Sequence, residues 1–396
     1  MQIHKLKNKL TLAFLKRPSN SVTINITIKT GSNHENPKEK GISHFIEHLL
    51  FEGTKTRTQK QIASEIEKIG GELNAQTSNE STTYYAIIPK KHFKKALIIL
   101  SDLIQNPLFK DSKIENERKI ILNEMKQTID QPRFYQWILF HKHLFKKHPA
   151  KYPISGYPFT VKKITKEQIL NYYQTYYIPN NTIISIVGNI KDPKHLVEEY
   201  FTFQPKKLKT KKFKKEKNLK QTKTEKRRIQ HSYLVLGYKT PSRKSKASYA
   251  LDIIKYYLGY GQSSKLFEEI REKYGLVYEI GAYYEANIDY GFFAIYLSTD
   301  KKNIKKVTQI ILKELNNLQN ITKKELQQTK EQIEGQFLLK TEDKHFLADL
   351  LTYYIELNKS KIDYIKQIKS ITLKDIKKIS KKYLNNNYTL TILKQK

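Results

Sequence analysis

The chain has 396 residues, a length that suits two domains of ordinary size better than one core. It contains no cysteine, which excludes disulfides and thiolate ligands, so histidine and carboxylate side chains would have to hold any zinc ion. Its 73 Lys and Arg residues against 38 Asp and Glu residues give a formal net charge of +35, and only eight of the basic residues are Arg. We interpret these scattered lysines as a solvated surface, so a nucleic acid partner is disfavoured.

The N-terminal sequence contains no apolar segment of targeting length. The longest apolar run there, residues 10–15, is too short for the core of a signal peptide. No other stretch approaches the length of a transmembrane helix. We therefore expect a soluble, cytoplasmic protein with no membrane partner.

The first half of the chain predicts a mixed α+β domain. Residues 10–30 alternate like two strands that are broken by turn residues at 17–21. Further strands are expected at 72–78, 81–89 and 182–187. Helical periods are expected at 59–69, 91–105, 111–129, 132–144 and 164–176. This domain is expected to end near residue 203.

The stretch 41–54, GISHFIEHLLFEGT, contains the pattern H-x-x-E-H. On a helix, His44 and His48 lie one turn apart on one face, with Glu47 beside them. Two imidazoles at this spacing can share a Zn²⁺ ion, and an adjacent carboxylate that is not a ligand can take a proton from an attacking water. A hydrogen-bonded surface cluster is the alternative reading of these residues.

Residues 204–228 are rich in lysine and almost free of apolar residues. We predict that this basic stretch links a first domain, 1–203, to a second domain, 229–396. Contact with an anionic partner is the alternative interpretation of the stretch.

The second half repeats the first. ITKEQILNYYQTYYIPNNTIIS from 164 matches ITLKDIKKISKKYLNNNYTLTI from 371 at an offset of 207, and Ala86 pairs with Ala294 at 208. We infer a duplicated domain. In this alignment His44 falls on Asp252 and His48 on Tyr256, so the second copy lacks the metal-binding residues.

Three segments together resemble the pitrilysin-type metallopeptidases, or inverzincins. They are GISHFIEHLLFEGT, GGELNAQTSNESTTYY and NERKIILNEMKQTIDQP. Within this family the chain is most similar to the two-domain processing-peptidase branch, which is related to the catalytic subunit of mitochondrial processing peptidase and to short bacterial homodimers. The resemblance implies two homologous α+β domains, each with a mainly antiparallel sheet packed with helices.

The resemblance also implies the rest of the metal site. Glu124 occupies the position of the third zinc ligand, and Glu117 that of a supporting acidic residue that does not bind metal. Three protein ligands would leave one position of a catalytic zinc open, which is the arrangement such a site needs. We expect one zinc ion per chain. By the same resemblance His141, His143 and His148 lie on a surface helix and its following loop, and we do not expect them to bind metal.

In the second half, Arg271 and Tyr278 match a pair that in this family reaches toward the zinc site. A guanidinium and a phenol can stabilise the charge that develops on an attacked carbonyl. The alternative for Arg271 is a surface ion pair on a helix.

Substrate binding is expected at residues 72–78. Small and polar residues at Asn74, Ala75 and Thr77 leave a sheet edge to which an extended peptide could add as a strand. A plain edge strand that a loop protects is the alternative.

The sequence as a whole predicts a zinc endopeptidase that cleaves short or unstructured peptides inside an enclosed chamber. The expected assembly is a homodimer with composite active sites. Two other classes remain open: a non-catalytic subunit of a processing-peptidase-like complex, and a polyanion-binding protein. The intact H-x-x-E-H motif argues against the former, and only the net charge favours the latter.

Overall fold

The structure, a computed structural model, describes residues 1–208, 211 and 213–396. The chain forms two compact α+β units, and neither unit is contiguous in sequence. The first contains Met1–Gln127, Tyr152–Lys212 and Lys340–Ile362; the second contains Thr128–Lys151, Phe213–Leu339 and Asp363–Lys396. No helix among the described residues has the length and apolar character needed to cross a membrane.

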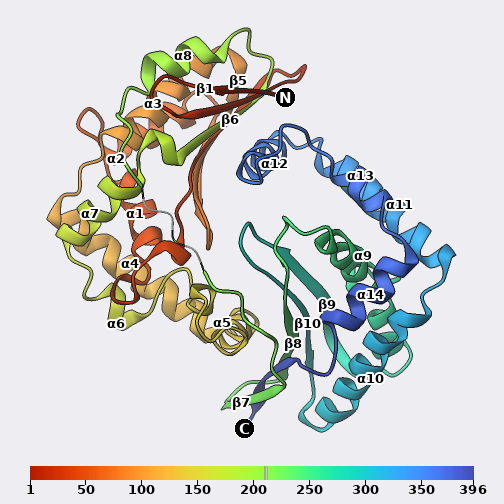
Figure 1. The fold of residues 1–396 in the computed structure, drawn as a ribbon. Helices are drawn as coiled ribbons and strands as arrows, with labels where there is room; N and C mark the ends of the chain where they lie inside the picture. The colour runs from red at the N-terminus through yellow and green to blue at the C-terminus, as the bar shows by residue number, and fades with distance from the viewer. Residues whose placement is uncertain (209–210, 212) are drawn as a thin grey trace. The chain divides into compact units, whose positions relative to one another are not determined.

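The first unit is built on a six-stranded sheet in the order β1-β2-β6-β3-β5-β4 (Figure 1). All its pairs are antiparallel except β2 with β6. The strands are β1 Gln2–Lys5, β2 Thr11–Lys16, β3 Ser21–Ile28, β4 Glu72–Thr77, β5 Thr82–Pro89 and β6 Thr182–Gly188. The helices are α1 Ile42–Phe51, α2 Gln59–Glu67, α3 Phe93–Gln105, α4 Asp111–Asp130, α6 Pro158–Val161, α7 Lys166–Tyr176, α8 Pro193–Tyr200 and α12 Lys344–Glu356.

The two faces of this sheet differ in polarity. In β3 the side chains of Val22, Ile24, Ile26 and Ile28 are buried in the core that α1 and α3 cover. The alternate residues Thr23, Asn25 and Thr27 point to the opposite face, because successive side chains of a strand alternate. Helix α12 packs on that polar face, where the hydroxyls of Thr352 and Ser185 lie 2.7 Å apart.

The second unit contains a five-stranded sheet in the order β7-β11-β8-β10-β9. Its strands are β7 Gln221–Arg227, β8 Ser232–Thr240, β9 Val277–Ala286, β10 Gly291–Thr299 and β11 Thr389–Gln395. Its helices are α5 Pro132–Leu144, α9 Ala247–Gly259, α10 Ile304–Asn317, α11 Lys323–Lys340, α13 Tyr364–Lys369 and α14 Leu373–Tyr383.

The sheet order agrees with the inferred duplication. The order β2-β6-β3-β5-β4 of the first unit corresponds to β7-β11-β8-β10-β9 of the second, and the first pair of each is parallel. The offset of 208 also aligns the buried faces of α1 and α9. The offset of 208 fails in the strands. Ala86 faces the main core of its unit, whereas Ala294 lies on the opposite face of its sheet. The predicted pair is therefore wrong by one residue.

The two units do not have the boundaries of the predicted domains 1–203 and 229–396, because helices α5 and α12 each belong to the other unit. Helix α5 belongs to the second unit, where it packs on β8 and β11, and α12 belongs to the first, where it packs on β3 and β6. Each helix lies in the half of the sequence opposite to the sheet that it covers. An amphipathic pattern shows which face of a helix is buried but not against which sheet, so the sequence could not reveal this exchange.

The predicted linker 204–228 is also shorter than expected. Residues 209, 210 and 212 lie outside the described part of the chain, but residues 213–339 belong to the second unit. Residues 221–227 form the edge strand β7, which pairs in parallel with β11. Main-chain pairing at an edge requires no apolar side chains, which explains why a polar segment forms a strand.

Glu216 fixes the part of this basic segment that precedes β7 to residues 146–148 of the second unit. Its carboxylate accepts hydrogen bonds from the backbone amides of Lys146, Lys147 and His148 at 2.9, 2.7 and 2.6 Å, and lies 3.4 Å from Lys239 Nζ. Burial alone would raise the pKa of Glu216, but these donors outweigh it and lower the pKa to about 2.

His141, His143 and His148 lie on a helix and its following loop as expected, but they are not all surface residues. They lie on and just after α5 in the second unit, where His141 stacks edge-on against Phe292 and the side chain of His148 is buried. Burial lowers the pKa of His141 to about 4. His141 and His148 pack among aromatic rings, which include Phe145, Tyr290 and Phe292.

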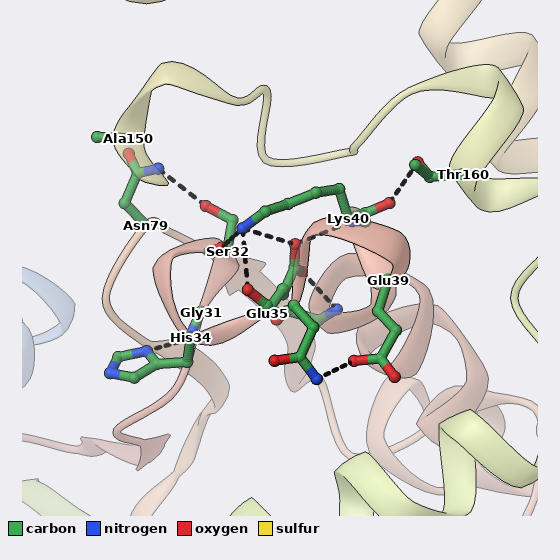
Figure 2. A network of polar contacts seen from close by, with 12 residues as sticks. Gly31, Ser32, His34, Glu35, Glu39, Lys40, Asn79, Ala150 and Thr160 are labelled. Carbon is green, nitrogen blue, oxygen red and sulfur yellow. Dashed lines mark hydrogen bonds and ion pairs between the residues drawn. The ribbon is translucent and has the colours of Figure 1, made fainter. Parts of the chain in front are cut away.

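The N-terminus of α1 is held by a buried ion pair, which Figure 2 shows from close by. The Glu35 carboxylate accepts hydrogen bonds from the amides of Gly41 and Ser43 at 3.0 and 2.9 Å. Lys40 Nζ lies 4.0 Å from that carboxylate and donates to the carbonyl of Ser32 at 2.8 Å. Anions are favoured at this end of a helix because its first amides have no intrahelical partner.

Gly41 completes the entry into the helix. Its φ is 101°, and a Cβ atom there would lie 2.4 Å from the carbonyl oxygen of Ser155. Only glycine fits this position without strain.

We expect Lys40→Met to lower the free energy of unfolding by about 3 kcal/mol, because Glu35 would stay buried without its countercharge. Chemical denaturation followed by circular dichroism measures the change. Lys38→Met is the matched control: this lysine is exposed two residues away, and its loss should cost less than about 0.5 kcal/mol. Equal effects of the two substitutions would show that the ion pair does not hold the helix.

A second prediction concerns Glu216 and acid. Its pKa falls from the ordinary 4.5 to about 2 on folding, so its stabilisation is complete above pH 4.5 and is lost as the pH falls toward 2. We expect Glu216→Gln to be less stable than the parent chain at pH 7, with a gap that narrows below pH 4.5. Denaturation midpoints at several pH values test this. Glu272→Gln, at an exposed position of the same unit, should show no such gap.

Candidate metal centre

Helices α1 and α4 bring the predicted ligands together. His44, His48 and Glu124 each offer one ligand atom, and these atoms lie within 4.8 Å of one another. The two histidines come from successive turns of α1, with ring centroids 4.7 Å apart. His48 Nε2 lies 3.6 Å from Glu124 Oε2 on α4. No other group of three or more such side chains forms in the described part of the chain.

Glu117 orients one of the ligands. It lies two turns before Glu124 on α4, is buried, and its Oε2 is 2.9 Å from His48 Nδ1. A hydrogen bond there leaves the Nε2 atom of His48 directed toward Glu124. Metal-binding histidines typically have such a carboxylate partner at the second nitrogen. The position predicted for a supporting acid therefore has the contact that this role needs.

The electrostatics of the two histidines differ. Burial, with the neighbouring His48, lowers the pKa of His44 to about 4. Burial also acts to lower the pKa of His48, but the hydrogen bond to Glu117 and the charges of Glu124, Glu117 and Glu47 outweigh it and raise that pKa. The buried Nδ1 atom of His44 has no hydrogen-bond partner among the described residues. Its imidazole is thus not held by a structural hydrogen bond of the kind that holds His48.

Glu47 lies beside this group and is not part of it. Its Oε2 accepts a hydrogen bond from the hydroxyl of Thr77, at the end of β4. Burial raises the pKa of Glu47, and the hydrogen bond from Thr77 partly opposes this. A carboxylate with a raised pKa is closer to the range in which it can both take up and release a proton.

The predicted substrate strand forms the open edge of the first sheet. β4 pairs only with β5, and its other side has no neighbouring strand in the described residues. The Ala75 amide donates to the side chain of Asn74 at 2.8 Å instead of to a strand. Thr77 was expected to line this open edge. Its side chain is instead buried and donates a hydrogen bond to Glu47. No sequence signal distinguished that role from substrate contact.

Arg271 and Tyr278 belong to the second unit. Arg271 lies in a π-helical turn, Phe267–Glu272, where its guanidinium is 5.0 Å from the ring of Phe267. Such turns are rare in proteins, and those that occur often lie at functional sites. The hydroxyl of Tyr278 donates to Asp300 at 3.2 Å. Both side chains are exposed, and their role at the metal group stays a prediction.

The second unit contains an ion pair at the corresponding position of its own helix. Asp252, which aligns with His44, is buried on α9 and accepts two hydrogen bonds from Arg243. Tyr256 stands where the first copy has His48, and its ring lies 4.3 Å from that of Tyr260. The position that His44 occupies in α1 is thus taken in α9 by a carboxylate that is already paired.

Comparison with known proteins identifies the family. Residues 12–156 match the profile of the insulinase family, peptidase family M16, and residues 163–333 match that of the peptidase M16 inactive domain. A Rickettsia felis protein, named as an uncharacterised zinc protease, is 35% identical over 344 residues, spanning 86% of this chain and 84% of that protein. The Bacillus subtilis zinc protease YmxG, also named as uncharacterised, is 30% identical over 382 residues, spanning 94% and 93%.

A solved structure shares the whole fold. The crystal structure of a protease from Helicobacter pylori superimposes with a TM-score of 0.92 over 99% of both chains, at 23% sequence identity. The profile matches and the relatives above establish that the chain belongs to the insulinase family of peptidases, family M16.

Proposed function

We propose that the protein is a zinc-dependent endopeptidase that hydrolyses short or unstructured peptides. The observation that carries this proposal is the convergence of His44, His48 and Glu124 beside Glu47, a carboxylate outside the group. Three ligands and one adjacent base are the minimum that metal-assisted hydrolysis of a peptide bond needs.

The donor set fits zinc. Two imidazole nitrogens and one carboxylate oxygen form a ligand set found in catalytic zinc sites, and the chain has no cysteine to complete a closed structural site. Glu117 fixes the orientation of His48, and the unpartnered Nδ1 atom leaves the His44 imidazole without a competing structural role. We propose one ion per chain. When bound, zinc polarises a carbonyl and makes water more acidic.

Glu47 supplies the proton transfers. The carboxylate oxygen that Thr77 does not hold, Oε1, would accept a proton from the attacking water and then release it to the amine of the leaving peptide. The hydroxyl of Thr77 holds this carboxylate in place and keeps one of its oxygens hydrogen-bonded. Thr77 is therefore a positioning residue in this proposal, and Glu47 is the catalytic base.

The edge of β4 supports binding of extended peptides. An added strand would form main-chain hydrogen bonds along Asn74 and Ala75. These would replace the present hydrogen bond from the Ala75 amide to the Asn74 side chain. Such bonds do not depend on the peptide sequence, and a folded protein has no free strand to offer. This favours short or unstructured substrates.

We further propose a homodimer in which Arg271 and Tyr278 of one copy complete the site of the other and enclose the substrate. The exposure of both side chains and the π-helical turn support a role outside their own unit. The alternatives are a non-catalytic subunit and a polyanion-binding protein. The assembled metal group disfavours the first, and only the net charge of +35 supports the second.

Substitution of Glu47 should separate metal binding from hydrolysis. We expect Glu47→Gln to retain about one zinc ion per chain and to lose nearly all hydrolysis, and His48→Ala to lose both. Metal analysis by mass spectrometry and digestion of a mixed peptide pool measure the two properties. If Glu47→Gln retains more than a few per cent of the activity, Glu47 is not the base.

Mixing two inactive variants tests the composite site. Glu47→Gln and Arg271→Ala chains should each be inactive, whereas random subunit exchange makes half of the dimers mixed, each with one intact site. We expect activity to recover to about a quarter of the parent value. Absence of recovery, with exchange confirmed by differently tagged chains, would contradict the shared site without affecting the zinc chemistry.

A further inference from the structure

A row of buried hydroxyl groups extends from Thr77 into the core of the first unit. The hydroxyls of Thr77 and Thr82 lie 3.5 Å apart, on the paired strands β4 and β5. Those of Tyr84, also on β5, and Tyr177, directly after α7, lie 2.8 Å apart. All four side chains are buried. The proposed function uses only Thr77, whose hydroxyl donates to Glu47.

The two pairs of hydroxyls meet at Thr82. Burial raises the pKa of Tyr177, and hydrogen bonds with Tyr84 and with Thr82 oppose this. The negative charge of Glu47 acts in the same direction as burial on both phenols. The Thr82 hydroxyl also donates to the carbonyl of Thr30 at 3.0 Å, which fixes its place between the strands. The row is therefore a continuous polar path that ends at the carboxylate.

The second unit lacks a hydroxyl at every corresponding position. The residue pairs next to the two hairpin turns match in register, and the repeat at an offset of 207 relates the segments after the helices. The replacements are Ala286 for Thr77, Gly291 for Thr82, Phe293 for Tyr84 and Leu384 for Tyr177.

This difference separates the hydroxyls from the needs of the fold. Phe293 and Leu384 are buried in the main core of the second unit, so apolar side chains fill the same places in the same strand order. That unit has Lys255 where the first has Glu47. The four hydroxyls thus occur in the copy that carries the carboxylate and are absent from the copy that has lost it.

A hydroxyl has a single proton, so Thr77 holds Glu47 only while that proton points to the carboxylate. Thr82 lies behind Thr77 and restricts its orientation, and the two phenols restrict Thr82 in turn. Hydrogen bonds in such a chain strengthen one another. Because a base must keep its position while protons move, this support should act on the chemical step and not on peptide binding.

We propose that three further hydroxyls keep the catalytic base Glu47 in position through Thr77. They belong to Thr82, Tyr84 and Tyr177. The inference rests on the proposed peptidase function and adds positioning residues to it. Loss of one of these hydroxyls should lower kcat and leave KM and the zinc content unchanged.

Replacing a phenol by a phenyl ring removes only the hydroxyl. Tyr84→Phe and Tyr177→Phe should each lower kcat about 3- to 10-fold, which is the effect of one net hydrogen bond. Tyr173→Phe is the matched control, because this phenol lies on α7 and donates to the carbonyl of Ile104 at 2.7 Å. It should keep the kcat of the parent enzyme. Equal losses in all three variants would overturn the inference.

A double-mutant cycle separates positioning through Thr77 from a general loss of stability. In a Thr77→Val background, Tyr84→Phe should change kcat by less than about 2-fold, because the path to Glu47 is already interrupted. The same cycle on the metal-free chain needs no activity: the denaturation midpoint of the double variant should shift by less than the sum of the single shifts. Additive effects in either measurement would contradict the proposed path.

Thr82 provides a second test if the phenol variants fold poorly. Thr82→Val keeps the shape without the hydroxyl and should lower kcat about 3- to 10-fold. Thr82→Ser, which restores the hydroxyl, should recover most of this loss. Equal kcat in the two variants, in an enzyme that cleaves peptides, would overturn this inference alone. If the parent enzyme cleaves no peptide, the proposed function fails and this inference fails with it.

Discussion

The metal-binding helix depends on a charge that is buried at its first turn. Glu35 accepts hydrogen bonds from two free amides of α1, and Lys40 balances its charge. The same lysine donates to Ser32, whose hydroxyl accepts from Asn79 in the turn between β4 and β5. One network therefore fixes the helix that carries Glu47 to the hairpin that carries Thr77. Removing a partner of a buried pair is costly, so this network holds Glu47 beside β4.

The two units show how one strand order supports different chemistry. At matching positions of the first helix after the third strand, one unit has His44 and the other has Asp252, which is paired with Arg243. The ion pair needs no external ligand, whereas the histidine group is incomplete without a cation. The sheet faces opposite the main cores also differ, since α12 covers a face with polar residues of β3 in one unit and α5 covers a cluster of aromatic and aliphatic side chains in the other. The metal group is thus found in one copy among the described residues, and the matching helix of the other copy carries a paired charge in its place.

Local patterns predicted most of the elements and the metal group. The spacing of His44 and His48 defines their geometry on any helix, and the resemblance located Glu124 and Glu117, which the structure places beside them. What failed was non-local. A shift of one residue moves every side chain of a strand to the other face, so Ala86 was matched to the wrong partner. Lys40 has the same appearance in sequence as dozens of surface lysines, and only its burial distinguishes it.

The exchanged helices have a consequence for the order in which the protein is made. The sheet that carries the metal group is covered on its polar face by α12, which ends at Glu356 in a chain of 396 residues. During synthesis the N-terminal half leaves the ribosome well before this helix exists, and domains fold as units once their parts are available. The first unit therefore cannot cover this face of its sheet until residues 344–356 have been synthesised. Strand β4 and the three residues of the metal group are all present by residue 124, so they exist in the growing chain for much of synthesis before α12 can pack on the sheet.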